Sequence, residues 1–135
     1  MSTIYSTSAR ASAGREGTIR LDDGTLAFDL SVPGSKKPGT NPEQLFAMGY
    51  AACFDSAAKA VARQLQLPVT ATETQATVEL QKVEYGFRLA VKITLSTKGL
   101  SRAQSETLLA AAHKLCPYSR ALRGDADVKV ALAEA

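Results

Sequence analysis

A nearly uncharged stretch from Thr40 to Val61 constrains the fold of this chain more than any other feature. No charged residue occurs between Leu45 and Phe54, and small residues are spread around every face of the helix that this segment would form. Such a helix has no polar side to turn toward water. We therefore predict a central helix that is packed on all sides and runs to about Gln66, ahead of Pro68.

The beginning of this helix is marked by residues that suit a helix N-terminus. The side chain of Thr40 or Asn41 can cap the first turn. Pro42 fits the first helical position, and Glu43 places a negative charge where the helix dipole favours one. The sequence therefore predicts that the helix begins close to Pro42.

One of only two cysteines, Cys53, lies in the middle of the predicted helix. A buried free cysteine usually serves as a small hydrophobic residue. A reactive one needs a stabilised thiolate, but Cys53 lies about ten residues into the helix, roughly 15 Å from the end where the dipole acts. Because burial alone raises the pKa of a thiol, a cation from elsewhere in the fold would have to lower it. Cys53 is therefore either core filling or an active centre.

The composition is that of an ordinary globular domain. Of the 135 residues, 45% are hydrophobic and 21% are charged, which predicts a single domain, residues 1–135, with a real core. The 16 basic and 13 acidic residues are interspersed, and Lys36-Lys37 is the only adjacent basic pair. We therefore expect no nucleic-acid partner. No apolar run is long enough to span a membrane, so no membrane partner is expected either.

The two cysteines, Cys53 and Cys116, are 63 positions apart. The N-terminal segment has an Ala-x-Ala pattern at Ala11–Ala13 but no apolar core before it, so a secretory signal is not expected. Without export features, two such cysteines indicate a reducing compartment, where a structural disulfide would not persist. A transient catalytic disulfide could form there.

The segments before the helix have the pattern of strands. Thr18–Leu21 and Leu26–Val32 flank Asp23-Gly24, a pair typical of a type I′ hairpin. An earlier strand around Ile4–Ala9 is expected on weaker grounds. The segment Gly14–Gly17 would then be a glycine-flanked loop between strands.

The second half of the chain predicts a longer hairpin, a helix and a last strand. Alternation from Val69 to Glu84 and from Phe87 to Leu95 indicates two strands with a turn near Tyr85-Gly86. Ser101 and Gln104 form a capping box that opens a helix ending at Cys116, before Pro117. A short helical turn over Tyr118–Arg123 and a strand carrying Val128, Val130 and Leu132 follow. The order predicts an α+β fold in which helices pack on antiparallel sheets.

If this chain carries out chemistry, its cysteines are the candidates for it. His113 precedes Cys116 by three positions, but this spacing without further ligands favours a histidine on a helix surface over a metal site, so we expect no metal. The sequence contains no Ser/His/Asp set, no glycine-rich phosphate loop and no EF-hand. No bound cofactor is expected.

Three separate motifs resemble the organic hydroperoxide resistance (Ohr) proteins of the OsmC/Ohr family. Thr40–Ala47 with Gly49–Phe54 is similar to the family's first cysteine motif, and Cys116–Ser119 with Ala121 to its second. Gly14–Gly17 is similar to the glycine-flanked G-R-D/E-G turn of the family. The resemblance covers the whole chain and implies an OsmC/Ohr-like fold, with antiparallel sheets around a long central helix and a second helix.

The match departs from the family pattern at two positions. Met48 stands where a small residue is common, and Arg120 stands where the residue is variable or often Asn.

The resemblance implies a thiol-dependent peroxidase that reduces organic hydroperoxides. Cys53 would be the peroxidatic cysteine, Cys116 the resolving cysteine, and Arg15 with Glu43 the charged pair that tunes the site. The family also implies a cytoplasmic homodimer with active sites at the subunit interface. Electrons would come from a dithiol co-substrate, for which a lipoylated protein is the reductant associated with this branch.

Physical chemistry agrees with a role for Arg15. Lowering a thiol pKa from about 8.5 toward 6 raises the thiolate fraction at pH 7 about thirtyfold, or roughly 2 kcal/mol. Cleaving an O–O bond also creates an alkoxide, whose charge needs a donor. A guanidinium suits both tasks because it stays charged and offers several donors in a fixed fork. Glu43 would hold its orientation.

A straight helix places Glu43 about 15 Å along the axis from Cys53, too far for both to meet one guanidinium. Either Pro42-Glu43 lies before the regular helix and folds back, or the Glu43 that reaches the site comes from the partner chain. The residues leave both alternatives open.

Two other functions remain open for the same residues. The chain could be a non-enzymatic binder of a lipid-like ligand with both thiols structural, or a redox sensor that relays oxidation to a partner. The large side chains near the cysteines could line an apolar substrate pocket or could be ordinary core. They are Phe46, Met48, Tyr50, Phe54 and Tyr118.

Overall fold

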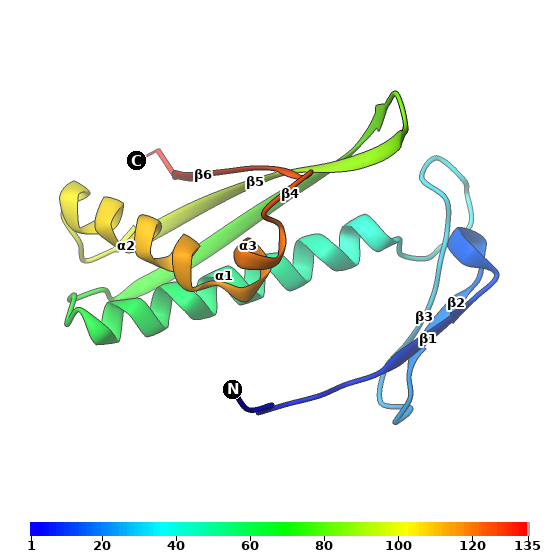
Figure 1. Ribbon diagram of the computed structural model, residues 1–135, viewed down its shortest axis with the longest axis horizontal. Helices are drawn as coiled ribbons and strands as arrows, with labels where there is room; N and C mark the ends of the chain where they lie inside the picture. The colour runs from blue at the N-terminus through cyan, green and yellow to red at the C-terminus, as the bar shows by residue number, and fades with distance from the viewer. Residues whose placement is uncertain (135) are drawn as a thin grey trace. The chain divides into compact units, whose positions relative to one another are not determined.

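The computed structural model describes residues 1–134, which fold into two compact units, one over residues 1–45 and the other over residues 46–134. In chain order the elements are β1 (Ala9–Ser12), a 3₁₀ turn η1 (Gly14–Glu16), β2 (Thr18–Leu21), β3 (Ala27–Asp29), α1 (Pro42–Gln64), β4 (Ala71–Val83), β5 (Gly86–Lys98), α2 (Arg102–Leu115), α3 (Pro117–Ala121) and β6 (Asp127–Leu132) (Figure 1). The α+β class expected from the sequence is confirmed.

The first unit is built on an antiparallel sheet with strand order β1-β2-β3. The expected glycine-flanked connection is present as η1, which joins β1 to β2. Gly17 closes this connection because a Cβ atom there would lie 1.7 Å from the carbonyl oxygen of Ser12. Only glycine permits so close an approach of two backbone segments. The turn therefore holds Arg15 between two strands.

Two details of this sheet were predicted wrongly. The first strand begins at Ala9, because the pairing partner of β1 is Thr18–Leu21 across η1, and Ile4 is left almost fully exposed. The turn after β2 is not type I′, which needs positive φ at both central residues. Only Gly24 has it, at 77°, while the Asp23 carboxylate accepts from both the N–H and the hydroxyl of Thr25.

The chain enters α1 through a capped first turn. Asn41 is the cap, since its side-chain oxygen accepts from the backbone N–H of Gln44 at 2.8 Å. The hydroxyl of Thr40 donates to the Gln44 side chain. Pro42 is the first residue of the helix and Glu43 lies in its first turn. The predicted beginning of the helix is therefore confirmed.

The second unit contains a sheet with strand order β4-β5-β6. The long hairpin of β4 and β5 is confirmed (Figure 1). Val83 pairs with Gly86 beside its turn. β6 runs parallel to β5, unlike the rest of the sheet, because α2 and α3 form a crossover between them. β6 pairs only with Ala90–Leu95, so the far end of the hairpin extends beyond it.

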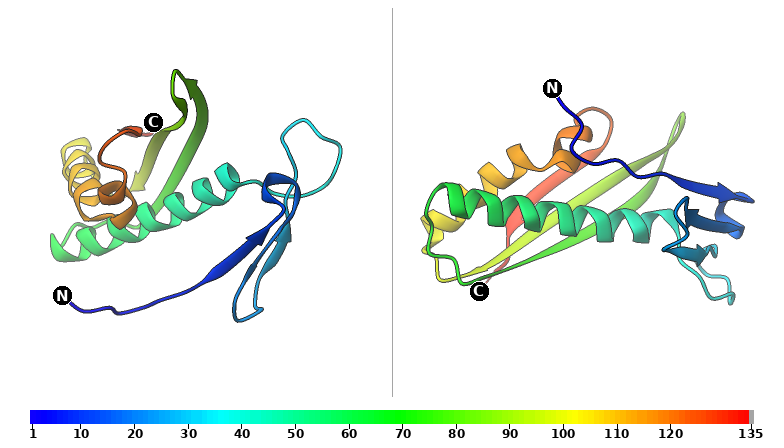
Figure 2. Two further views of the ribbon diagram at one scale, coloured as in Figure 1. Left: turned by 45° about the vertical axis from the view of Figure 1, so that its right-hand side comes forward. Right: turned by 90° about the horizontal axis from the view of Figure 1, so that it is seen from below.

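Helices α1 and α2 run alongside the three strands and form the core of this unit with one face of the sheet (Figure 2). Hydroxyl groups tie both helices to the strands. Thr74 of β4 donates to Asp55 of α1, and Thr97 of β5 shares a hydrogen bond with Ser105 of α2. The largest fully buried side chains are Tyr50, Phe54, Ile93, Leu95, Leu108 and Cys116.

The expectation that α1 is packed on all sides is wrong for the single chain. A stripe of residues spaced three or four apart is exposed, namely Met48, Ala52, Ser56, Lys59 and Arg63. The small residues of the sequence do not reveal this stripe, because alanine and serine are compatible with either environment.

Both long helices end at defined residues. α1 ends at Gln64, after which Gln66 adopts φ 52° and donates to the carbonyl of Arg63, while Leu67 donates to that of Ala62. This is the hydrogen-bond pattern of a Schellman cap. α2 opens with the predicted capping box of Ser101 and Gln104. No described helix is long and apolar enough to cross a membrane.

Candidate active site

The two cysteines lie in contact within the second unit. The Sγ atom of Cys116 donates to the Sγ atom of Cys53 at 3.4 Å, and both thiols are free. Cys116 is completely buried, whereas Cys53 is partly accessible. A reagent from solution would therefore react first with the sulfur of Cys53. The sulfur of Cys116 is in contact with it but is shielded from solvent.

Local sequence explains how Cys116 reaches this position. It is the residue after α2 and before α3, and its backbone is extended, with φ −61° and ψ 120°. Pro117 cannot continue α2 because it lacks an N–H donor, but it suits the first position of α3. The chain therefore turns at Cys116, beside the middle of α1.

The surroundings of Cys53 within the second unit favour its neutral form. Burial is the largest influence and raises the pKa of its thiol, and the hydrogen bond and charge of Cys116 act in the same direction. The backbone N–H of Tyr118, at the beginning of α3, lowers the pKa. Among the described residues of this unit, no basic side chain contributes. As inferred from the sequence, a reactive Cys53 thiolate therefore still needs a cation to stabilise it.

The first unit holds a strong ion pair between Arg15 and Glu43. The two terminal guanidinium nitrogens donate to the two carboxylate oxygens at 2.8 and 2.6 Å. The hydrogen bond lowers the pKa of Glu43 and raises that of Arg15. Such a bidentate pair fixes the plane of the guanidinium group. The structure thus joins these two predicted site residues to each other.

The structure also decides one question about Glu43. Because α1 begins at Pro42, Glu43 belongs to the regular helix. The alternative in which Pro42 and Glu43 precede the helix is therefore wrong.

An aromatic cluster lies beside the cysteines. The rings of Phe46, Tyr50 and Tyr118 contact one another with centroids 5.8 to 6.0 Å apart. Gly49 makes room for it, since a Cβ atom there would lie 3.0 Å from the hydroxyl oxygen of Tyr118. The cluster packs α3 against α1.

The five large side chains considered for a substrate pocket differ in accessibility. Met48 and Tyr118 are exposed, and Phe46 is half-buried. Tyr50 and Phe54 are fully buried, so they are core residues and cannot contact a substrate.

Sequence reasoning missed a buried hydrogen bond next to the cysteines. The hydroxyl groups of Tyr50 and Ser119 lie 2.6 Å apart, and both residues are buried. Each belongs to a cysteine motif, three positions from its cysteine. The small polar side chain of Ser119 inside the second cysteine motif is a signal that could have raised the question of its partner.

His113 is partly buried, contrary to the expectation of a surface histidine. Its Nδ1 atom is buried and has no hydrogen-bond partner among the described residues. Within the same residues, no group of three potential metal ligands is found.

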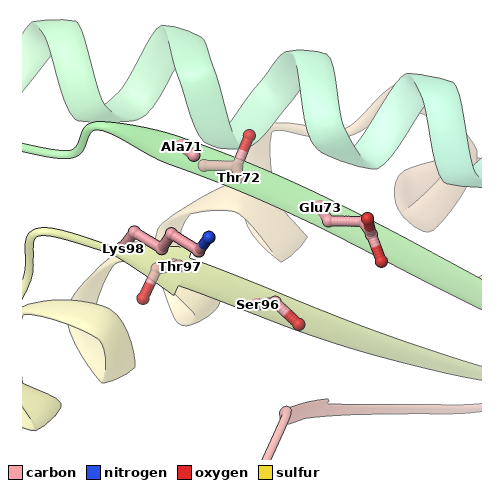
Figure 3. A pocket seen from close by; sticks show the side chains of 6 residues that line it. All are labelled: Ala71, Thr72, Glu73, Ser96, Thr97 and Lys98. Carbon is pink, nitrogen blue, oxygen red and sulfur yellow. The ribbon is translucent and has the colours of Figure 1, made fainter.

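Hollows away from the cysteines are found in both units. A groove over β4 and β5 is lined by Ala71, Thr72, Glu73, Ser96, Thr97 and Lys98 (Figure 3). Its hydroxyl and charged side chains do not suit a lipid chain. The other hollow is apolar and is lined by Ala9, Ile19, Arg20, Leu21, Leu26, Phe28 and Leu45 of the first unit.

Comparisons with known proteins place this chain in one group. Residues 34–131 match the family described as OsmC-like protein. Organic hydroperoxide resistance protein OhrB of Bacillus subtilis is 44% identical over 134 residues, covering 96% of this chain and 98% of the relative. The organic hydroperoxide resistance protein of Xanthomonas axonopodis pv. citri is 43% identical, with 96% and 95% covered.

Solved structures agree with these matches. The crystal structure of Bacillus subtilis OhrB is similar with a TM-score of 0.90 at 42% identity, covering 97% of this chain and all of the other. An organic hydroperoxide resistance protein from Legionella pneumophila gives a TM-score of 0.93 at 41% identity, covering 98% and 100%.

Proposed function

Because this chain belongs to the organic hydroperoxide resistance branch of the OsmC-like family, we propose that it is a thiol-dependent peroxidase that reduces organic hydroperoxides to alcohols. Cys53 is the peroxidatic cysteine, since it is the accessible member of the pair. Cys116 is the resolving cysteine.

The reaction has three balanced steps. The Cys53 thiolate attacks one hydroperoxide oxygen, the O–O bond breaks, and the departing alkoxide takes up a proton to give the alcohol and a sulfenic acid on Cys53. The Cys116 sulfur then attacks the Cys53 sulfur, which forms a disulfide and releases water. A dithiol reduces this disulfide and is itself oxidised to a disulfide.

The distance of 3.4 Å between the two Sγ atoms is the observation that carries this proposal. Reacting atoms in a near-attack arrangement lie about 3 to 3.5 Å apart. A disulfide needs about 2.05 Å, so a small displacement of one cysteine completes the bond. Two core cysteines with only a packing role would not need to be in contact.

We assign Arg15 as the cation that stabilises the Cys53 thiolate and the departing alkoxide, with Glu43 holding it in place. The bidentate pair supports this assignment because it fixes the guanidinium fork and leaves further N–H donors for other acceptors. Glu43 lies within regular helix, so we propose that the Arg15–Glu43 pair acting on each Cys53 is supplied by a partner subunit of a homodimer.

Exposed apolar side chains in each unit support a dimer. Leu26 and Phe28 are 54% and 44% exposed, and both line the apolar hollow of the first unit. Leu80 and Phe87 are 45% and 66% exposed at the far end of the long hairpin. Apolar surface gathered in this way is typical of an interaction face.

The electron donor in this proposal is a dithiol co-substrate of the dihydrolipoyl type, carried by a lipoylated protein, and no cofactor is bound. A dithiol suits a buried Cys116, because it can attack the accessible Cys53 sulfur and then close its own ring. The expected cytoplasmic location stays a prediction.

The substrate in this proposal carries an alkyl chain. Met48, Phe46 and Tyr118 are the accessible large apolar side chains near the cysteines, and contact with them would remove the chain from water. Each buried methylene contributes about 0.8 kcal/mol. Three such groups would favour an alkyl hydroperoxide over hydrogen peroxide about fiftyfold.

A coupled assay tests this function against its alternatives. The protein is mixed with tert-butyl hydroperoxide and excess dihydrolipoamide, and hydroperoxide consumption is followed. A peroxidase consumes many equivalents per chain, a redox sensor about one, and a lipid-like-ligand binder none. Consumption limited to one equivalent or less would exclude the peroxidase.

A further inference from the structure

The hydrogen bond between Tyr50 and Ser119 runs parallel to the contact between the cysteines. On α1, Tyr50 precedes Cys53 by three positions, and after α2, Ser119 follows Cys116 by three positions. Two side-chain hydrogen bonds therefore join the same two segments, Tyr50 with Ser119 at 2.6 Å and Cys116 with Cys53 at 3.4 Å. In the proposed reaction, only the second of these contacts becomes a covalent bond.

The segment that carries Ser119 cannot hold its own position. α3 has only five residues. Its backbone hydrogen bonds include those from the N–H of Arg120 to the carbonyl of Cys116 and from the N–H of Leu122 to the carbonyl of Tyr118. So short a helix is unstable by itself, because its few hydrogen bonds do not offset the unfavourable free energy of helix nucleation. Its placement depends on contacts with α1. The Tyr118 ring supplies the apolar contact, and Ser119 supplies the buried polar one.

Both hydroxyl groups need this bond. Tyr50 is fully buried and Ser119 is 4% exposed, so neither can turn to water if the other is lost. A buried hydroxyl without a partner is unfavourable, and the structure relaxes to satisfy it. Such relaxation would move α3, and with it Cys116 at its N-terminal end.

We propose that Tyr50 and Ser119 are positioning residues for the resolving step, because their buried hydrogen bond keeps the Cys116 sulfur within attacking distance of Cys53. This inference rests on the proposed function. Neither residue touches the hydroperoxide, because both are buried. A displacement of about 1 Å in a reacting group can slow a step up to a hundredfold. Their loss should therefore slow disulfide formation more than sulfenic acid formation.

The test uses the full chain with Ser119→Ala, Tyr50→Phe and Ser119→Thr. Rapid-quench mass spectrometry with tert-butyl hydroperoxide measures the rates of sulfenic acid and disulfide formation on Cys53. In Ser119→Ala and Tyr50→Phe, the ratio of the second rate to the first should fall about tenfold. Sulfinic acid on Cys53 should accumulate at lower peroxide. Ser119→Thr keeps a hydroxyl and should restore most of the ratio.

Ser105→Ala is the matched control. It removes a similar hydroxyl pair, Thr97 with Ser105 at 2.8 Å, whose serine is 6% exposed and lies in α2. Thermal unfolding checks that all variants are folded. The control should lose stability and keep the ratio of the two rates. If Ser119→Ala and Tyr50→Phe keep the ratio as Ser105→Ala does, the two residues are merely structural and the proposal is wrong.

A second readout is independent of peroxidase activity. Equilibration of each folded protein with reduced and oxidised dithiothreitol gives the effective concentration of one cysteine at the other. The effective concentration should fall about tenfold in Ser119→Ala and Tyr50→Phe. This raises the reduction potential of the Cys53–Cys116 disulfide by about 30 mV. An unreactive parent would reject the proposed function, while this equilibrium would still decide the positioning role. Unchanged values in both variants would overturn it.

Discussion

Each terminal nitrogen of the Arg15 guanidinium donates to a different oxygen of the Glu43 carboxylate, at 2.8 and 2.6 Å. This arrangement uses two of the five N–H donors of the arginine side chain and leaves three. Arg15 can therefore donate further hydrogen bonds while it is paired with Glu43. A thiolate or a departing alkoxide can bind to the same fork while Glu43 keeps it from rotating.

Arg15→Ala should slow the reaction of Cys53 about a hundredfold or more with every peroxide, because the thiolate and the leaving oxygen both lose a charged donor. Arg15→Lys should be intermediate, since an ammonium keeps the charge without the fork. Second-order rate constants for hydrogen peroxide and tert-butyl hydroperoxide measure the effect. Arg10→Ala is the control, because Arg10 of β1 forms an ion pair with Asp22 in the same unit. Equal losses in both alanine variants would contradict a specific role for Arg15.

The pH dependence of Cys53 should separate burial from the proposed cation. Burial raises the pKa of this thiol. Because the thiolate is the nucleophile, the alkylation rate increases as the pH rises through that pKa. Arg15 opposes burial in our proposal, and Arg15→Ala should move the midpoint of the alkylation profile to higher pH. The rate of iodoacetamide labelling between pH 5 and 10 gives the profile. Identical midpoints in the parent and Arg15→Ala would show that another group stabilises the thiolate.

Replacements of Phe54 and Met48 should have different consequences. Phe54 is fully buried, so Phe54→Ala should cost about 3 to 5 kcal/mol of stability with no selective effect on substrates. Met48 is 60% exposed, so Met48→Ala should change stability by about 0.5 kcal/mol or less. It should slow a fatty-acid hydroperoxide about tenfold while sparing hydrogen peroxide. Denaturant unfolding and rate constants test both, and equal effects on the two peroxides would exclude Met48 from substrate contact.

Light scattering should give a mass of twice 14.3 kDa at micromolar concentration. Phe87→Asp should weaken the dimer, because it puts a charge on the exposed apolar end of the long hairpin. Thr77→Asp is the control, since Thr77 is exposed on the same hairpin but on the opposite face of the sheet. A monomeric parent protein would also exclude a partner-supplied Arg15–Glu43 pair.

Local features of the fold were predictable because they depend on neighbouring residues. The capping box of Ser101, the glycine-flanked turn at Arg15 and the long hairpin each follow from spacing within one segment. Pairing between distant segments was not. The parallel pairing of β6 with β5 depends on how α2 and α3 cross the sheet, and strand composition does not encode this direction.

The site was predictable in its residues and not in its geometry. The resemblance supplied Cys53 and Cys116, but a sequence separation of 63 positions gives no distance between their sulfur atoms. Residue type also fails to show which way a side chain points. Met48 and Tyr50 are both large and two positions apart on α1, yet one is 60% exposed and the other is fully buried. Tyr50 faces the core and α3, whereas Met48 does not.

The central claim is that Cys53 and Cys116 form a reversible disulfide during turnover, and one measurement tests it most directly. The reduced protein receives one equivalent of tert-butyl hydroperoxide and is mapped by mass spectrometry under non-reducing conditions, with Cys53→Ser and Cys116→Ser in parallel. The account predicts an intramolecular Cys53–Cys116 disulfide in the parent, a trapped sulfenic acid on Cys53 in Cys116→Ser, and no reaction in Cys53→Ser. Only intermolecular disulfides, or two untouched thiols, in the parent would contradict it.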